Sequence, residues 1–217
     1  MKGLVIQCEV LYFATFRKPA STSLILTFTI PPFTTIRGMI ANALGHQQHD
    51  HSLQEQIRLS IRMRDPGFKN VEMAKVLKLK ESPAPPSTRY PSSPMFREYL
   101  VNPKYEIFVG GQAEVITRVQ EALMFPARPL YLGQSDDLVE LETSDVIDVE
   151  EVEVDHIHTV VEGIYPGCLV EKVPFTFSEE KGKYSVVYKV ISIPVNEQPI
   201  DKTGNAYRFK EMNVFLF

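Results

Sequence analysis

The sequence predicts an α+β protein with a ferredoxin-like first domain. Two observations carry this prediction: runs that alternate apolar and polar residues as strands do, and two segments with the apolar spacing of amphipathic helices. Over residues 1–141 their order is strand, helix, strand, strand, helix, strand, which is the ferredoxin-like order. A chain of 217 residues fits one large domain or two small ones. We therefore expect a ferredoxin-like domain over residues 1–141 and a β-rich domain over residues 142–217.

The first strand and the first helix are predicted between residues 2 and 45. Residues 2–13 alternate apolar and polar side chains, and residues 24–30 are β-branched and aromatic, which is typical of extended chain. Thr34 or Thr35 is expected to cap the helix that follows, and Gly45 to end it. The apolar face of this helix is formed by Ile36, Met39, Ile40, Ala43 and Leu44.

The remaining elements of the first domain follow from the same two patterns. Residues 58–64 alternate basic and apolar side chains, which predicts a strand with one cationic face. Residues 104–111 form another strand that ends in a pair of glycines. Residues 128–141 predict a strand, a turn from Gly133 to Asp137 and an extended exit. The second helix presents one apolar face with Val115, Ile116, Val119, Ala122 and Leu123.

A proline-rich stretch interrupts this order. Residues 82–99 hold prolines at positions 83, 85, 86, 91 and 94. Because proline cannot donate to a strand ladder, we expect a projection or loop rather than core. In the β-rich second region, the turn in "SEEKGKY" (178–184) predicts a hairpin between two strand-like runs.

The charge of the chain is divided unevenly between its two halves. Residues 1–128 hold 16 Lys and Arg against 10 Asp and Glu, a balance of +6, and residues 129–217 hold 7 against 17, a balance of −10. The basic part is suited to phosphates. The carboxylates of residues 136–155 repel them, and we expect this acidic run to face solvent or a basic protein.

Several classes of protein are disfavoured. No apolar run approaches the length of a membrane-spanning helix, and the N-terminus reads as a strand rather than a signal peptide. Cys8 and Cys168 lie in strand-like patterns, which favours buried free thiols and a reducing cytoplasm. Neither glycine-rich nucleotide-binding loop motif occurs, nor does a G-x-S-x-G nucleophile elbow.

The histidines offer a metal site as an alternative. His46, His49, Asp50 and His51 form the cluster "HQQHDH", and imidazole is a common zinc ligand. The cluster follows the expected helix end at Gly45, however, and no ligand motif is complete. We therefore favour a polar loop, with no metal and no cofactor predicted.

Basic residues interleaved with aromatic residues are the more informative signal. Arg58, Arg62 and Arg64 would share one strand face, which is either a solvated face or a phosphate-binding one. Aromatic rings beside cations suit single-stranded RNA, because rings stack on bases while cations contact phosphates. The other cations are Arg17, Lys18, Arg37, Arg89, Arg97 and Lys104, and the rings near them are Tyr90, Phe96, Tyr99 and Tyr105.

The join before the first helix, Pro31 to Gly38, combines several signals. The two prolines stop the preceding strand. Arg37 adds a cation near a helix N-terminus, whose free amides favour anions. Gly38 costs about 1 kcal/mol relative to alanine within a helix, which suggests a close approach to the backbone. Arg37 and Gly38 are therefore our best candidate for a phosphate seat.

Two motifs resemble a known family. "ATFRKP" followed by "PPFTTIRGMIANALG" is similar to the N-terminal signature of the CRISPR-associated RAMP proteins of the Cas-five group. "PLYLGQSDDLVEL" (129–141) resembles their second conserved segment and follows in the right order. The resemblance covers residues 1–141. It implies a ferredoxin-like (RAMP, RRM-like) domain, a projecting β-hairpin thumb, here at about residues 80–104, and a variable C-terminal β domain.

The resemblance also implies a function. It predicts a cytoplasmic, prokaryotic subunit of a type I CRISPR Cascade complex that binds the 5′ handle of the crRNA and caps the backbone in antiviral defence. Its implied partners are the crRNA handle, the repeating backbone subunit, the large subunit and, indirectly, target DNA, but no membrane. The expected RNA-binding residues are Arg17, Lys18, Arg37, Gly38, Arg58, Arg62, Arg64, Arg89, Tyr90, Arg97, Lys104, Gly133, Gln134 and Ser135.

The alternative is a metal-independent endoribonuclease that processes CRISPR repeat RNA. In one subtype of the family, this subunit cuts RNA with a Tyr and a Lys-His pair. The present sequence contains no Lys-His dipeptide, which favours a binding role without catalysis. If the chain is an enzyme, the acid or base is expected to be Tyr12, Tyr131 or one of His46, His49 and His51 next to a lysine.

Overall fold

An antiparallel sheet forms the centre of the protein, which is mixed α/β with mostly strands. The computed structural model describes residues 1–19, 24–77 and 92–217. The sheet has the order β4-β7-β1-β8, and β9 pairs with the start of β1. Its strands are β1 (Lys2–Val10), β4 (Ile57–Asp65), β7 (Lys104–Gly111), β8 (Val139–Thr143) and β9 (Ile147–Asp148).

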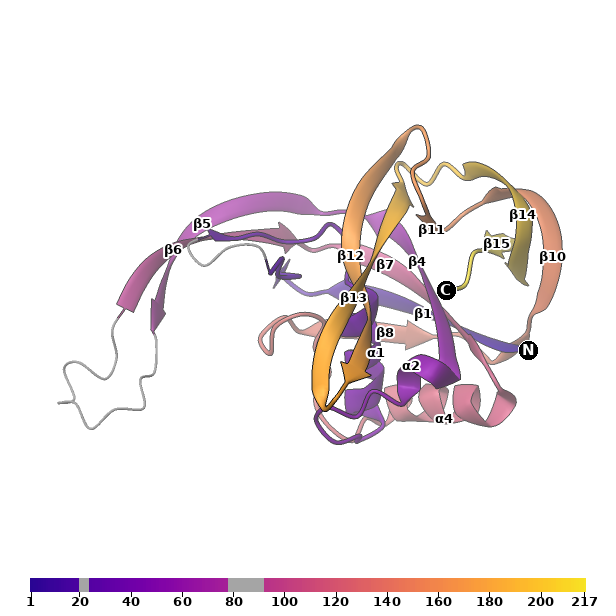
Figure 1. Ribbon diagram of the computed structural model, residues 1–217, viewed down its shortest axis with the longest axis horizontal. Coiled ribbons are helices and arrows are strands. Elements are labelled where there is room, and N and C mark those ends of the chain that lie inside the picture. The colour runs from indigo at the N-terminus through magenta and orange to yellow at the C-terminus, as the bar shows by residue number, and fades with distance from the viewer. Residues whose placement is uncertain (20–23, 78–91) are drawn as a thin grey trace.

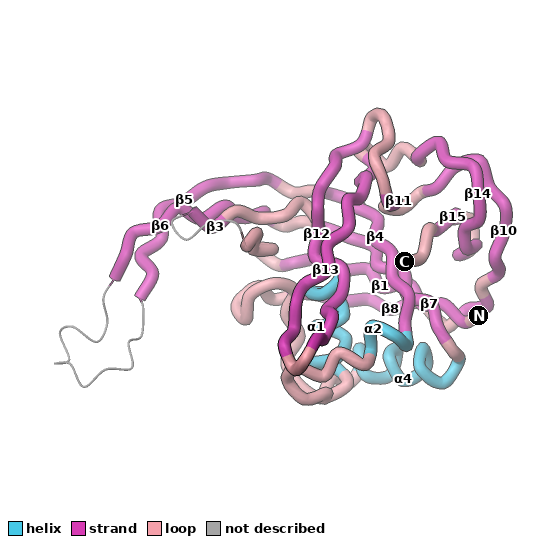
Figure 2. The backbone as a smooth tube through the Cα atoms, in the orientation of Figure 1, coloured by secondary structure: helices cyan, strands magenta, loops and turns pink. Residues whose placement is uncertain are grey.

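The helices gather on one side of this sheet (Figure 2). They are α1 (Phe33–Ala43), the single turn α2 (Leu53–Gln56) and α4 (Ala113–Met124). Their apolar faces join Leu4 and Ile6 of β1 in the largest core cluster. The other side of the sheet is partly covered from the C-terminal end, where Phe108 packs with Phe209 and Leu216. Within the described residues, no helix is long and apolar enough to cross a membrane.

The start of α1 differs from the prediction, whereas its end agrees. The predicted threonine cap is wrong: the helix begins at Phe33, and the carbonyl of Pro32 accepts from the N–H groups of Thr35 (2.9 Å) and Ile36 (3.1 Å). Both threonines therefore lie inside the first turn. The end at Gly45 (φ +77°) is confirmed, and its N–H donates to the carbonyl of Asn42 (3.1 Å) as in a Schellman turn.

A long hairpin projects from the body (Figure 1). It consists of β5 (Phe68–Leu77) and β6 (Ser92–Val101), paired antiparallel over their full lengths. On its other edge β6 pairs with β2 (Phe13–Ala14) and β3 (Leu24–Ile25). The described part of the hairpin thus begins before the proline-rich stretch. Residues 78–91, with Arg89, Tyr90 and most of the prolines, lie outside the described residues.

The C-terminal region forms two three-stranded sheets. One has the order β10-β14-β15 and the other β11-β13-β12. The predicted hairpin is confirmed: β12 and β13 are joined at Lys181 (φ 52°) and Gly182 (φ 73°). The strands are β10 (Glu150–Ile157), β11 (Val161–Glu162), β12 (Cys168–Glu180), β13 (Lys183–Pro194), β14 (Ile200–Phe209) and β15 (Met212–Val214).

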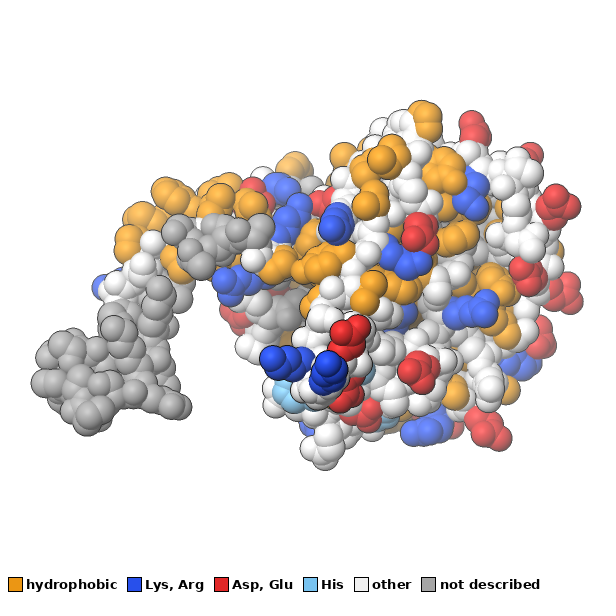
Figure 3. Space-filling view, viewed as in Figure 1, with side chains coloured by type: hydrophobic (Ala, Val, Ile, Leu, Met, Phe, Trp, Pro, Cys, Tyr) orange, Lys and Arg blue, Asp and Glu red, His pale blue; other side chains and the backbone are white. Residues whose placement is uncertain are grey.

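The main core crosses the predicted domain boundary. Val160, Val173, Ile191 and Ile193 are fully buried in the same cluster as α1 and β1. The division at residues 141/142 stays a prediction. Both cysteines are free, with Cys8 buried and Cys168 half-buried. The acidic side chains of β10, including Glu150 and Glu153, are exposed, and Figure 3 shows carboxylates gathered along that edge of the molecule.

Candidate functional site

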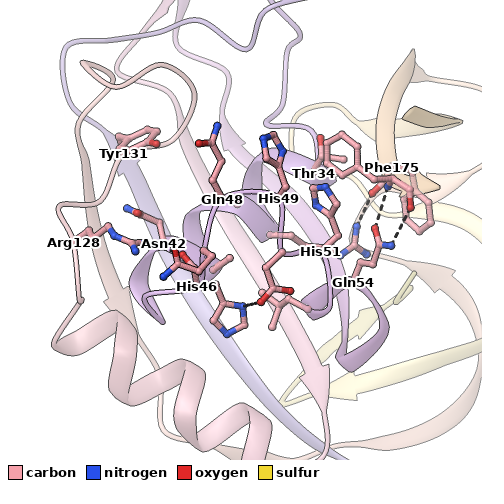
Figure 4. Close-up of a pocket in the computed structure, with 17 residues that line it drawn as sticks. Thr34, Asn42, His46, Gln48, His49, His51, Gln54, Arg128, Tyr131 and Phe175 are labelled. Atoms are coloured by element: carbon pink, nitrogen blue, oxygen red, sulfur yellow. Dashed lines mark hydrogen bonds and ion pairs between the residues drawn. The ribbon is translucent and has the colours of Figure 1, made fainter. Parts of the chain in front are cut away.

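A groove of about 600 Å³ lies between α1, the segment 46–54 that follows it, the loop 128–131 and β12 (Figure 4). Arg37 and Gly38, the predicted phosphate seat, line it from α1. Tyr131, from the second family-like motif, lines it from the opposite loop. The two motifs lie some ninety residues apart along the chain, yet both reach this one groove.

The wall at the end of α1 is held by hydrogen bonds to helix-terminal carbonyls. Arg128 donates from Nη1 to the carbonyl of His46 (2.9 Å) and from Nη2 to that of Gly45 (3.3 Å). Asn42 donates from Nδ2 to the carbonyl of Pro129 (2.8 Å). A cation at a helix C-terminus is also favoured by the helix dipole. These bonds fix the loop 128–131 against α1.

The opposite wall is the strand β12. Arg37 donates from Nη1 to the carbonyl of Phe175 (2.6 Å), and its guanidinium lies 5.1 Å from the centre of the Phe175 ring. The imidazole of His51 stacks on Phe177, with ring centres 4.3 Å apart. Gln54 holds the backbone of Phe177 through both of its amide atoms, at 2.9 and 3.0 Å.

The groove has more cationic than anionic side chains. Burial lowers the pKa of Arg37 to about 10, so the guanidinium remains charged at neutral pH. Its Nε is buried without a hydrogen-bond partner. Asp50 is paired with His46 at 3.3 Å, and hydrogen bonds from Ser52 lower the pKa of its carboxyl. The site is therefore suited to an anion beside planar rings.

The surroundings of Gly38 bear on the close approach to the backbone that the sequence suggested. Apart from the backbone of α1 itself and the two neighbouring residues, no atom of the described residues lies within 4 Å of the place that a Cβ would occupy, and Gly38 is exposed at the groove. The close approach predicted from this glycine is therefore not made by any described part of the protein itself. The space beside the backbone is open to a ligand.

Several predicted cations are paired within the chain, away from the groove. Arg62 and Arg64 each bond to both Glu106 and Glu197, at distances from 2.6 to 3.2 Å. These pairs tie β4 and β7 to the segment before β14. The exposed Arg58 donates to the hydroxyl of Tyr207 (2.7 Å).

The remaining predicted residues lie around the base of the hairpin or on the surface. Lys18 pairs with Glu171 and Lys104 with Glu9, both at 2.8 Å. Arg17 is exposed, and its backbone bridges to Thr27. The other predicted residues described by the structure are Arg97, which points inward to Asp137, Gly133 and Gln134 beside that carboxylate, and the exposed Ser135.

Some residues of the groove were not among the predicted binding residues. The histidines of segment 46–51 were weighed as metal ligands, and the structure instead places them along the groove. No pattern in the sequence around Arg128 indicated a role in a binding site. Phe175 and Phe177 alternate in β12, which predicts a shared face but not the element that this face meets.

Solved structures define the class of fold. A chain described as "CRISPR RNA-guided surveillance complex" is 14% identical, with a TM-score of 0.63, over 94% of this chain and 91% of that one. A "CRISPR protein from Archaeoglobus fulgidus" is 14% identical, with a TM-score of 0.59, over 98% and 97%. A third, "Cas protein", is 16% identical, with a TM-score of 0.53, over 91% and 98%. The fold is thus that of CRISPR Cas proteins.

A family comparison makes the assignment specific. The family described as "CRISPR-associated protein (Cas_Cas5)" matches residues 6–190. The chain belongs to this family, which confirms the resemblance to the Cas-five group of RAMP proteins. A search of curated proteins found no match to this chain.

Proposed function

We propose that this chain is the crRNA-binding subunit of a type I CRISPR Cascade surveillance complex, where it holds the 5′ handle and caps the backbone. One observation carries the proposal: the two family-like motifs meet at a groove that holds Arg37, Arg128 and three imidazoles against a single carboxylate. Family membership supports the same role. A relative described as a surveillance complex adds a shared fold.

We further propose a ferredoxin-like RAMP domain with a thumb. The sheet order β4-β7-β1-β8 and the two longer helices packed against one face of that sheet support the ferredoxin-like assignment. The projecting pair β5 and β6 supports the thumb. In this proposal the repeating backbone subunit and the large subunit are neighbours, and target DNA is met only indirectly. The acidic run 136–155, apart from the buried Asp137, faces a basic neighbour or solvent of the prokaryotic cytoplasm, away from RNA.

Phosphate contacts are assigned first to the predicted cations that need no rearrangement. Arg17 and Arg58 are exposed, whereas Arg37 is buried with its Nε unpartnered and would have to turn toward the groove to contact a phosphate. Gly38 leaves room for close approach to the backbone. The remaining assigned residues contribute only where RNA replaces an existing partner or meets an exposed atom: Lys18, Arg62, Arg64, Arg97, Lys104, Gly133, Gln134 and Ser135.

Salt dependence tests this proposal. Binding of a single-stranded repeat-handle RNA should weaken with salt, with a log–log slope of about −0.7 for each phosphate neutralised. The double variant Arg17→Gln with Arg58→Gln should flatten the slope by about 1.4. Arg118→Gln, which removes an exposed cation from α4, is the matched control and should leave it unchanged. A flat salt dependence in the wild-type protein would contradict the proposal.

Endoribonuclease activity is the second candidate, because the groove also brings together four of the five predicted acid or base candidates. His46, His49, His51 and Tyr131 line it, whereas Tyr12 and the lysines that the structure describes do not. Repeat RNA incubated with the protein in a chelator should stay intact if the chain only binds. Specific cleavage that is lost in His46→Ala, His49→Ala or His51→Ala would favour the enzyme instead.

A further inference from the structure

A buried carboxylate lies where the projecting hairpin leaves the body. Asp137 has no exposed surface. Its Oδ2 accepts hydrogen bonds from the N–H groups of Thr15 and Gln134, both at 2.9 Å. Its Oδ1 lies 3.5 Å from Nη2 of Arg97. One side chain thus joins the loop 131–138, the segment after β2 and the hairpin strand β6.

The loop 131–138 is closed around this carboxylate. Gly133 has a φ of +123°, and a Cβ there would lie 2.5 Å from Oδ2 of Asp137. The N–H of Leu132 donates to the carbonyl of Asp137, and the N–H of Asp137 donates to that of Gln134, both at 3.0 Å. The glycine and the buried aspartate of this family-like sequence are therefore accounted for by the geometry of the loop.

Arg97 connects Asp137 to the hairpin strand β6. Its Nε donates to Oγ1 of Thr15 (2.9 Å), and its guanidinium lies 5.2 Å from the centre of the Phe13 ring. Thr15 in turn donates from Oγ1 to the carbonyl of Glu98 (3.1 Å). These bonds hold the edge of β6 that faces the body.

The contact between Arg97 and Asp137 lies beyond the base of the hairpin, and this position allows it to restrain the hairpin's angle. β2 pairs with β6 at Leu100 and Val101, at the base of the hairpin. Arg97 lies three residues further out, about 10 Å along an extended strand. One attachment at the base would allow the hairpin to pivot, whereas a second attachment further out restrains its angle. The short strand β3 adds pairing at Phe96 and Arg97 on the same edge.

We propose that Asp137 is a positioning residue: its carboxylate restrains Arg97 and thereby sets the angle at which the hairpin leaves the body. In this proposal the loop 131–138 holds that carboxylate in place, in addition to any contact its exposed residues make with RNA. The proposal goes beyond the crRNA-binding role, because it concerns the free protein. The hairpin carries exposed apolar side chains, with Phe96 at 56% and Met73 at 71% exposure, so its angle decides where that surface is offered to a partner.

Spin-label distance measurements test the proposal without RNA. Labels are placed at Ser92→Cys on the hairpin and Arg118→Cys on α4, in a Cys168→Ser background, because both label sites are exposed and Cys168 is half-buried. Asp137→Asn should broaden the distance distribution and shift its mean. Arg97→Lys keeps a cation but loses the Nε donor to Thr15, and should give a smaller change in the same direction.

Glu106→Gln is the control, since it removes a carboxylate that pairs with Arg62 and Arg64 of the central sheet rather than with Arg97 of the hairpin. It should leave the distribution as in the wild type. Unchanged distances in folded Asp137→Asn would overturn the proposal, as would equal broadening in Glu106→Gln. If Asp137→Asn does not fold, an unchanged distribution in Arg97→Lys overturns the proposal instead. Failure of RNA binding in the wild type would count only against the crRNA-binding role.

Discussion

Replacing Phe33 with alanine should remove a large part of the stability of the whole chain. Phe33 is fully buried at the start of α1. Its ring centre lies 5.3 Å from that of Phe175 in β12 and 4.8 Å from that of Phe217 at the C-terminus. Three segments far apart in sequence therefore meet at one ring. Lys189 covers the cluster, with Nζ 4.7 Å from the centre of the Phe175 ring.

The size of the effect follows from burial. Truncation of a fully buried Phe to Ala costs about 3–5 kcal/mol, and the loss of two aromatic contacts places this site near the upper end, at about 4–5 kcal/mol. A domain is stable by about 5–15 kcal/mol in total, so the variant should lose between about a third and nearly all of its stability. The free energy of unfolding would be measured by urea titration followed by circular dichroism, with Tyr fluorescence as a second probe because the chain has no Trp.

Phe125→Ala is the control for Phe33→Ala. Phe125 is 83% exposed, so Phe125→Ala should change the free energy of unfolding by less than about 0.5 kcal/mol. A loss of less than about 2 kcal/mol in Phe33→Ala would show that the site collapses without cost, against the packing argument. Two separate transitions, with the C-terminal strands unfolding first, would show that the shared core does not couple the two regions.

Three further predictions concern single residues. Gly38→Ala should raise the free energy of unfolding by up to about 1 kcal/mol, because the new methyl group meets no described atom outside its own stretch of α1. It should also weaken RNA binding if the ligand uses the open space, and unchanged affinity in a filter-binding assay would remove Gly38 from the site. Gly133→Ala should cost about 2 kcal/mol in urea titration, because φ is +123° and the Cβ would press on Asp137. His158 accepts the N–H of Asn213 through Nδ1 (3.0 Å), and burial, with the neighbouring imidazole, lowers the pKa of His158 below 6.5. Because the folded pKa lies below the unfolded one, its contribution to stability is complete above pH 6.5 and is lost as the pH falls through the folded pKa. Calorimetry should therefore show a smaller loss of Tm between pH 7.5 and pH 5 in His158→Gln, and equal losses would contradict this account.

The spacing of apolar residues predicted the helices and strands that bury one face, because the buried face of such an element is the face that carries its apolar side chains. The helices near residues 36–44 and 115–123 and the strands near residues 58–64 and 104–111 all occur. Sequence failed at the N-cap of α1, where two threonines suggested a side-chain cap and a proline instead supplies the backbone carbonyl. The prolines drew attention to residues 82–99, although the described hairpin strand β5 begins at Phe68.

The candidate site was harder to predict, because charge alone does not show which partner a cation has. Arg37 and Gly38 do reach the groove. Arg62 and Arg64 share a strand with the expected cationic pattern, yet they are paired with Glu106 on the next strand and with Glu197, 135 residues from Arg62. The wall formed by Phe175 could not be predicted from the sequence either, since its carbonyl accepts a hydrogen bond from Arg37, 138 residues away. Such contacts depend on topology that local pattern does not contain.

The contact between Gln54 and β12 has a consequence for how this protein meets other chains. A strand at the edge of a sheet offers free N–H and C=O groups, to which an extended segment of another chain can add. The side-chain amide of Gln54 gives Phe177 one donor and one acceptor, the same two bonds that an added strand would give. A single glutamine in a one-turn helix therefore closes this part of the edge, and an extended peptide would have to displace it before it could lengthen the sheet there.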